Sequence, residues 1–151
     1  MRVRLARLAD SRVLEAAMRT NQHHEQGVFV ARSAFPRRPE AVGPARNWAA
    51  QVYREWGGGS EEQAEICALL VSELATNAVL HADGERFEVT VWPKHVIDVR
   101  DTSTEKPEAR ASGMNDENGR GLLLVDALSE EFEVIQVDGG KIVRFRLARE
   151  G

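Results

Sequence analysis

The chain has 151 residues, of which 42% are hydrophobic and 29% are charged, and its formal net charge is −4. A chain of this size fits one domain with a single core, and the acidic balance argues against a dedicated nucleic-acid-binding protein, which normally has a basic surplus. Cys67 is the only cysteine, which excludes an intramolecular disulfide and a two-cysteine metal site.

No apolar run approaches the roughly 20 residues that span a bilayer. The arginines at the start of the chain are not followed by the apolar core of a signal peptide. We therefore expect a cytoplasmic protein that contacts neither a membrane nor nucleic acid directly. Residues 1–26 are a separate arginine-rich segment, for which a flexible arm, a docking helix and sequence upstream of a later start at Met18 are all open. The domain itself is expected over residues 27–151.

The domain is expected to begin with one short strand and two helices. Residues 28–31 read as a strand that later prolines break, and the spacing of apolar residues predicts a helix over residues 40–56. Ser60 is a suitable N-cap, and Gln63 completes a capping box three residues later. A second helix is therefore expected over residues 61–82.

The second helix carries polar groups in register. Glu73, Asn77 and His81 place a carboxylate, an amide and an imidazole at intervals of four residues, so all three lie along one stripe of the helix. The neighbouring stripe is apolar and contains Ile66, Leu70, Leu74 and Ala78. By itself this spacing is typical of a solvated helix edge. Two later segments change that interpretation.

Two strands follow, over residues 87–92 and 96–101. Asp101 ends the second strand, where its carboxylate suits a hydrogen bond from a ligand amine; the alternative is an aspartate that merely forms the turn. Asp98 has the opposite parity along the strand, so we expect it to face solvent or cross-strand partners.

Glycines come next, after a long irregular segment. Residues 102–118 have no periodicity, and a loop of this length inside a compact domain is usually functional or disordered. Gly119 and Gly121 then precede a helix expected over residues 122–128. Glycine allows close backbone approach and a helix N-terminus offers free N–H groups, so the pair suits a phosphate group. The alternative is a plain helix-entry turn, in which Arg120 points into water.

A hairpin over residues 132–137 and 142–147, with glycines in its turn, completes the domain. The order of elements is strand, two helices, two strands, loop, helix and two strands. This order predicts an α+β two-layer sandwich, with a mixed, mostly antiparallel sheet and the helices on one face.

In this order and spacing, three segments resemble the Bergerat ATP-binding family, which contains gyrase, heat-shock chaperones, histidine kinases and MutL. Residues 71–82 correspond to its N box, Asp101 to the aspartate of its G1 box and residues 119–122 to its G2 box. The resemblance is closest to the small bacterial anti-sigma-factor serine/threonine kinases, and it covers roughly residues 28–148. It implies the two-layer sandwich of the Bergerat fold.

The resemblance also implies a site for ATP and Mg²⁺. Asn77 would be the magnesium ligand, Glu73 the general base and Asp101 the residue that binds adenine. Residues 102–118 would form a nucleotide lid. His81 would lie near the phosphates, although a histidine that interacts with the dipole at the helix C-terminus is equally consistent. The remaining nucleotide-binding residues would be Gly119, Arg120, Gly121 and Leu122.

Two departures from the family pattern concern the adenine side. Thr102, Ser103 and Thr104 stand where glycines usually follow the G1 aspartate, although the small-kinase branch often lacks those glycines too. The family usually has a Lys–Thr pair at the start of its last strand, and here the pair is Lys141 and Ile142. We expect the missing hydroxyl to weaken nucleotide affinity.

The leading hypothesis is an ATP-dependent serine/threonine kinase that phosphorylates a small antagonist protein and sequesters a sigma factor. The alternatives are a non-catalytic regulator that binds ATP, or only its protein partner, and, less favoured, the catalytic fragment of a histidine kinase. The expected partners are a sigma factor, an anti-sigma-factor antagonist protein or both, and a homodimer is open.

Overall fold

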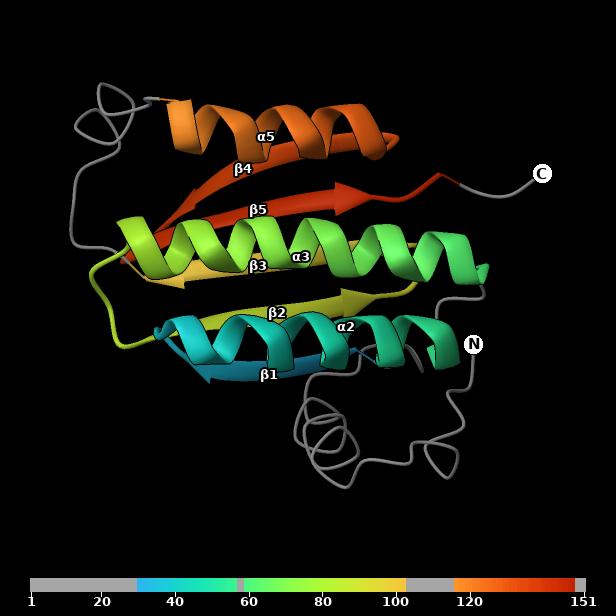
Figure 1. Ribbon diagram of the computed structural model, residues 1–151, viewed down its shortest axis with the longest axis horizontal. Coiled ribbons are helices and arrows are strands. Elements are labelled where there is room, and N and C mark those ends of the chain that lie inside the picture. Colours follow the sequence, from blue (N-terminus) through green and yellow to red (C-terminus); the bar gives the residue numbers. More distant parts are fainter. Residues whose placement is uncertain (1–29, 57–58, 103–115, 149–151) are drawn as a thin grey trace.

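The structure is a computed structural model and describes residues 30–56, 59–102 and 116–148. Figure 1 shows two layers, in which the helices lie side by side across one face of a sheet, as the sequence predicts. The elements in chain order are β1 (Ala31–Pro36), the 3-10 helix η3 (Pro39–Ala41), α2 (Val42–Trp56), α3 (Glu61–His81), β2 (Arg86–Trp92), β3 (Val96–Thr102), α5 (Asp116–Leu128), β4 (Glu131–Val137) and β5 (Gly140–Arg146).

The five described strands have the order β1-β2-β3-β5-β4, and each neighbouring pair is antiparallel. The expected α+β sandwich is confirmed, but the parallel component of a mixed sheet is not present among these strands. The reason lies in the path of the chain. After β3 and α5 the chain passes first to the outer edge as β4 and returns as β5, so the strand beside β3 runs against it.

The core lies between the sheet and the helix layer, and strand parity decides which side chains enter it. In β3, Ile97 and Val99 are buried in this core, whereas Asp98 has the opposite parity. The largest fully buried side chains come from both layers and include Tyr53, Leu70, Phe87, Ile97 and Phe145. Any polar residue with the parity of Ile97 and Val99 is therefore directed toward the helices.

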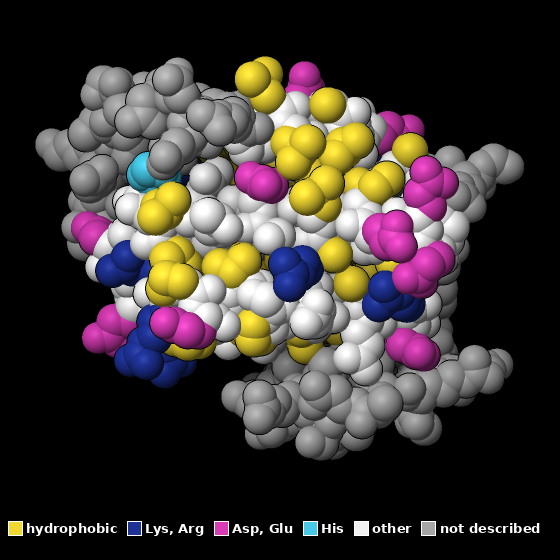
Figure 2. Space-filling model, viewed as in Figure 1, with side chains coloured by type: hydrophobic (Ala, Val, Ile, Leu, Met, Phe, Trp, Pro, Cys, Tyr) yellow, Lys and Arg dark blue, Asp and Glu magenta, His cyan; other side chains and the backbone are white. Residues whose placement is uncertain are grey.

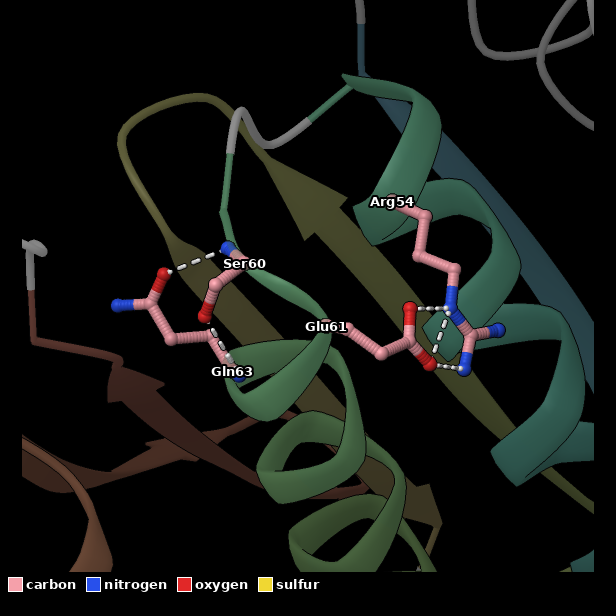
Figure 3. A network of polar contacts seen from close by, with 4 residues as sticks. All are labelled: Arg54, Ser60, Glu61 and Gln63. Carbon is pink, nitrogen blue, oxygen red and sulfur yellow. Dashed lines mark hydrogen bonds and ion pairs between the residues drawn. The ribbon is translucent and has the colours of Figure 1, made fainter.

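Helix α3 starts at the capping box expected from the sequence (Figure 3). Ser60 Oγ accepts a hydrogen bond from Gln63 N at 3.1 Å, and Ser60 N donates to Gln63 Oε1 at 3.1 Å. This arrangement satisfies backbone donors that a helix N-terminus leaves without intrahelical partners. Arg54 of α2 also donates to Glu61 of α3, with 2.8 Å between Nε and Oε2. The start of α3 is therefore tied to the end of α2.

Helix α3 is also long and apolar enough to cross a membrane, judged by length and composition alone. In the structure it is the central helix of the layer, and one side of it packs against α2 and the sheet. Its buried residues are Gln63, Ala64, Cys67, Leu70, Val71, Leu74, Ala75 and Ala78. The apolar composition of α3 therefore corresponds to the burial of one side of this helix in the core.

The first strand lies later than expected. Residues 28 and 29 are outside the described part, Val30 is not in a strand, and β1 extends to Pro36. Its alternation was not recognised because it is an edge strand of small and polar residues, in which only Ala31 is fully buried. Pro36 is tolerated because it is the last residue of a strand at the edge of the sheet, where a missing N–H costs little.

The third helix starts earlier than expected. The sequence predicted a loop over residues 102–118 and a helix from residue 122, but Thr102 is the last residue of β3 and α5 begins at Asp116. The predicted nucleotide lid otherwise lies in residues 103–115, outside the described part. Glycines were taken as a boundary because they weaken helices, yet the helix continues through them.

The outer surface of the helix layer carries exposed apolar side chains. Leu69 and Leu80 of α3 are 41% and 57% exposed, and Leu123 of α5 is 69% exposed. Figure 2 shows hydrophobic side chains gathered over α5 on this face, with acidic side chains grouped at one end. Apolar surface that is rimmed by charge often marks a protein-binding region.

Candidate functional site

The three segments singled out in the sequence meet at one end of the domain. In Figure 1, α3 and β3 both run toward this end, and α5 and β5 both start there. Glu73, Asn77 and His81 lie in the second half of α3, and Asp101 is the penultimate residue of β3. The fold therefore places residues that are far apart in the sequence around one region.

Asn77 of α3 lies against the backbone of α5 at Gly121. A Cβ atom added to Gly121 would lie 2.6 Å from Asn77 Nδ2, a separation that real Cβ contacts do not show. The missing side chain is therefore what allows α5 to pass this close to the amide. The structure brings together the N-box asparagine and the second glycine of the G2 box, as the sequence interpretation requires.

The glycines of α5 act differently from the expectation, however. Gly119 and Gly121 were expected just before a helix, where backbone N–H groups are free to bind phosphate. Because α5 begins at Asp116, the free N–H groups belong to the residues at that start, and both glycines follow within the helix. Gly121 contributes through close approach to Asn77 rather than through an unpaired N–H. Arg120 also lies on α5, and Leu122 packs partly buried against the core.

Asp101 is directed toward the helices. It shares the parity of the buried Ile97 and Val99, and it is only 5% exposed. Its Oδ2 atom lies 3.9 Å from Nζ of Lys141, an opposite charge that offsets part of the cost of burying a carboxylate. A carboxylate accepts several hydrogen bonds at once, so it can hold a ligand amine beside its protein partners.

Asp98 serves a different purpose on the opposite face of the sheet. Its oxygens accept hydrogen bonds from Arg144 Nε at 2.7 Å and from Trp92 Nε1 at 2.9 Å. The guanidinium of Arg144 also lies 5.6 Å from the centre of the Trp92 ring, within the range of a cation–π contact. The sequence prediction that Asp98 meets cross-strand partners is confirmed, and this aspartate belongs to the sheet rather than to the site.

The expectation about Ile142 is wrong. Lys141 pairs directly with Asp101 in the register of β3 and β5, whereas Ile142 pairs with Arg100. Because neighbouring residues of a strand point to opposite faces, Ile142 is directed away from the face that carries Asp101. The missing hydroxyl at residue 142 therefore does not bear on the adenine side. The residue opposite the aspartate is a lysine.

Two glycines make close approaches beside Asp101 that the sequence did not predict. A Cβ atom on Gly140 would lie 2.0 Å from the backbone oxygen of Asp101, and one on Gly84 would lie 1.6 Å from Thr102 Oγ1. Gly84 N also donates to Thr102 O at 3.1 Å. Because these glycines have no Cβ atom, β5 and the loop after α3 can pack closely against the end of β3. Their role depends on strand order, which local sequence does not reveal.

Glu73 and His81 flank Asn77 on α3. Glu73 lies one turn earlier on the same stripe and is partly buried. His81 is the last residue of the helix, and its Nε2 atom is buried without a hydrogen-bond partner among the described residues. A buried polar atom without a partner is costly unless a ligand or water meets it. This fits a ligand contact, and the role of His81 stays a prediction.

Other reactive groups lie away from this region. Burial raises the pKa of the Cys67 thiol to about 12, which leaves it protonated and unreactive near neutral pH and agrees with a structural role. In the described residues there is no group of three or more His, Cys, Asp or Glu side chains placed to hold a metal ion.

Residues 35–147 match the model of the family described as the histidine kinase-like ATPase domain. The chain belongs to this family. The match includes every element from the end of β1 to β5, and thus all the site residues discussed above. No curated protein matches the chain. As a histidine kinase-like ATPase domain, the protein is an ATP-binding, kinase-like domain, and the anti-sigma-factor branch is a narrower assignment.

The contact between Gly121 and Asn77 gives a direct prediction. Gly121→Ala should displace the Asn77 amide, because the added Cβ overlaps the flexible end of that side chain. Alanine is favoured over glycine inside a helix by up to about 1 kcal/mol, so the fold should persist. We expect ATP affinity to fall at least about tenfold, the effect of losing one good hydrogen bond, as measured by isothermal titration calorimetry.

Gly43→Ala in α2 is the matched control. Its added Cβ would meet only the Arg46 side chain at 3.6 Å, an ordinary contact. Because Gly43 precedes Pro44, where a Cβ atom is disfavoured in helical backbone, this variant should lose some stability, but it should bind ATP as well as wild type does. Unchanged affinity in Gly121→Ala would show that Asn77 does not need its observed position for nucleotide binding.

Proposed function

We propose that the protein is an ATP- and Mg²⁺-dependent serine/threonine kinase that phosphorylates an antagonist protein and binds a sigma factor. The observation that carries this proposal is the contact of Asn77 with Gly121, which joins the N-box helix to the glycine-containing helix. A second supporting observation is that Asp101 is buried on the helix side of the sheet, where it could bind the adenine end of ATP. The proposed compartment is the cytoplasm.

Each residue of the site would have a separate task. Asp101 would accept a hydrogen bond from the exocyclic amine of adenine. The Asn77 amide oxygen would be one ligand of Mg²⁺, a hard cation that prefers oxygen. Because the described protein residues offer no cluster of acidic ligands, the phosphate oxygens would supply much of the remaining coordination, as they do in other ATP sites. Bound ATP supplies the phosphoryl group.

Glu73 would act as the general base. It lies one turn before Asn77 on the same side of α3 and is only partly exposed, so it can receive a proton from a hydroxyl presented beside the phosphates. The exposed Leu123 lies two residues after Gly121 on α5. Exposed apolar surface on the helix that also carries Gly121 suits a protein partner, which supports a protein kinase over an enzyme for small molecules.

A non-catalytic regulator is the second candidate, and one observation favours it. The ammonium group of Lys141 lies 3.9 Å from the Asp101 carboxylate, at the side where an adenine amine would bind. This charge competes with the ligand for the carboxylate and would lower nucleotide affinity. A protein with weak affinity for ATP would then act mainly through its protein partner.

The adenine assignment is tested by Asp101→Asn. An amide lacks the negative charge of the carboxylate and can present a donor where an acceptor is needed. Wild-type protein at about 100 times Kd of Mg-ATP should gain about 2.7 kcal/mol of stability, or roughly 5–10 °C in Tm. Differential scanning fluorimetry should show most of this gain lost in the variant.

Asp98→Asn is the control, since Asp98 lies on the opposite face and holds Arg144. This variant should lower the Tm of the nucleotide-free protein but keep the increase caused by Mg-ATP. If Asp101→Asn keeps the full increase, the adenine assignment is wrong. If wild-type protein shows none at millimolar Mg-ATP, the catalytic proposal fails.

The kinase and the regulator are separated by Glu73→Gln and Asn77→Ala. Glu73→Gln is nearly isosteric, so it should keep ATP binding while phosphoryl transfer falls by roughly 10²- to 10⁴-fold. Asn77→Ala removes a metal ligand and should reduce both binding and transfer. The measurements are ATP affinity by calorimetry and transfer of labelled phosphate to candidate antagonist proteins.

Equal loss of ATP binding in both variants would make Glu73 a structural or metal-linked residue rather than a base. If both side chains are only part of a solvated helix edge, each substitution should change stability by no more than about 0.5 kcal/mol and leave nucleotide binding unchanged. Wild-type protein that binds ATP but transfers phosphate to no partner would favour the non-catalytic regulator.

A further inference from the structure

Arg37, just after β1, makes three hydrogen bonds to the end of α3 and the loop that follows it. Its Nη1 donates to Val79 O at 2.8 Å, and its Nε donates to Gly84 O at 2.5 Å. Its backbone N–H donates to Glu85 O at 2.8 Å. One arginine therefore joins the edge of the sheet to a segment that is more than forty residues away in the sequence.

The bond to Val79 meets a requirement of the helix itself. The last four carbonyl groups of an α-helix have no intrahelical partner, and Val79 is among them because α3 ends at His81. A cation at a helix C-terminus also interacts favourably with the helix dipole. Val79 lies two residues from both Asn77 and His81, so Arg37 restrains the turn that carries these site residues.

The bond to Gly84 reaches the other half of the site. Gly84 N donates to Thr102 O at 3.1 Å, and Thr102 Oγ1 donates to Arg86 O at 3.1 Å. Thr102 directly follows Asp101 in β3. Hydrogen bonds and covalent backbone therefore connect the turn that contains Asn77, through Arg37 and Gly84, to Asp101.

We propose that Arg37 is a positioning residue that fixes the end of α3 relative to the end of β3. It thereby sets the distance between the groups that would hold the phosphates and the group that would hold adenine. The three hydrogen bonds of Arg37 described above all end on backbone carbonyl groups and not on the side chains of the site. The guanidinium suits this task because its fixed fork of donors can bond two carbonyl groups at once, which a single ammonium does less well.

This inference rests on the proposed nucleotide site and predicts a specific pattern of affinities. ATP spans both halves of the site, whereas adenosine meets only the adenine half. Loss of the Arg37 connection between the two halves should therefore weaken ATP binding by about tenfold to a hundredfold, in line with the effect of small misplacements of binding groups. Adenosine binding should stay nearly unchanged. A merely structural role would leave the ratio of the two affinities unchanged in folded protein.

The experiment compares Arg37→Met, which keeps an apolar stem, with Arg37→Lys and wild type. Affinities for Mg-ATP and for adenosine are measured by calorimetry at a temperature where all three proteins are folded. We expect the preference for ATP over adenosine to fall in Arg37→Met and to be partly restored in Arg37→Lys. Arg54→Met is the control, because Arg54 holds the opposite end of α3 through Glu61; it should keep the preference.

Hydrogen exchange in the nucleotide-free proteins provides a second readout. The amide of Gly84, bonded to Thr102 O, and that of Ala82, bonded to Ala78 O, should exchange faster in Arg37→Met than in wild type or in Arg54→Met. If Arg37→Met does not fold, Arg37→Lys decides the question through the same two measurements.

Two outcomes would overturn the inference without overturning the proposed function: an unchanged preference for ATP, which includes an equal loss of affinity for both ligands, or unchanged exchange at Gly84. Wild-type protein that binds neither ligand would instead overturn the proposed function. In that case the exchange rates at Gly84 and Ala82 alone decide whether Arg37 holds the two ends together.

Discussion

The close approach of α5 to the side chain of Asn77 is the constraint on which the site depends. Only a glycine at residue 121 leaves room for the amide between the two helices. Helix α5 also covers the half of the sheet formed by the last hairpin, with Leu122, Leu124 and Leu128 packed on the core. The packing of α5 on the core therefore also fixes the position of Asn77. The stability of the domain and the geometry of the site both depend on this packing.

Strand parity separates the two aspartates of β3 into a structural group and a site group. Asp98 is matched by the planar guanidinium of Arg144 on one face, with both oxygens bonded. Asp101 is buried on the helix side with Lys141 opposite it. A buried carboxylate is costly unless it is compensated, and the two are compensated in different ways. The compensation of Asp101 involves an ammonium group 3.9 Å away, which a ligand amine can supplement or displace.

Much of the fold was predictable because its strongest signals are local. The capping box at Ser60 and the long periodic pattern of α3 define that helix from sequence alone, and parity placed Asp98 and Asp101 on different faces. The failures involve contacts between distant segments. The start of α5 was missed because glycine propensity suggested a boundary, whereas the helix begins at Asp116 and continues through both glycines to pack on α3 at Gly121. The pairing of Lys141 with Asp101 follows from strand order, which only the fold supplies.

The most direct test of the account is chemical-shift mapping of isotopically labelled protein during a titration with Mg-ATP. The account predicts saturable shifts of the backbone amides of Asn77, Asp101 and Gly121, and of the side-chain amide of Asn77. Asp98, on the other face of the sheet, should shift little. The absence of shifts at millimolar Mg-ATP, or shifts that are confined to the face around Asp98, would contradict the assignment of the site.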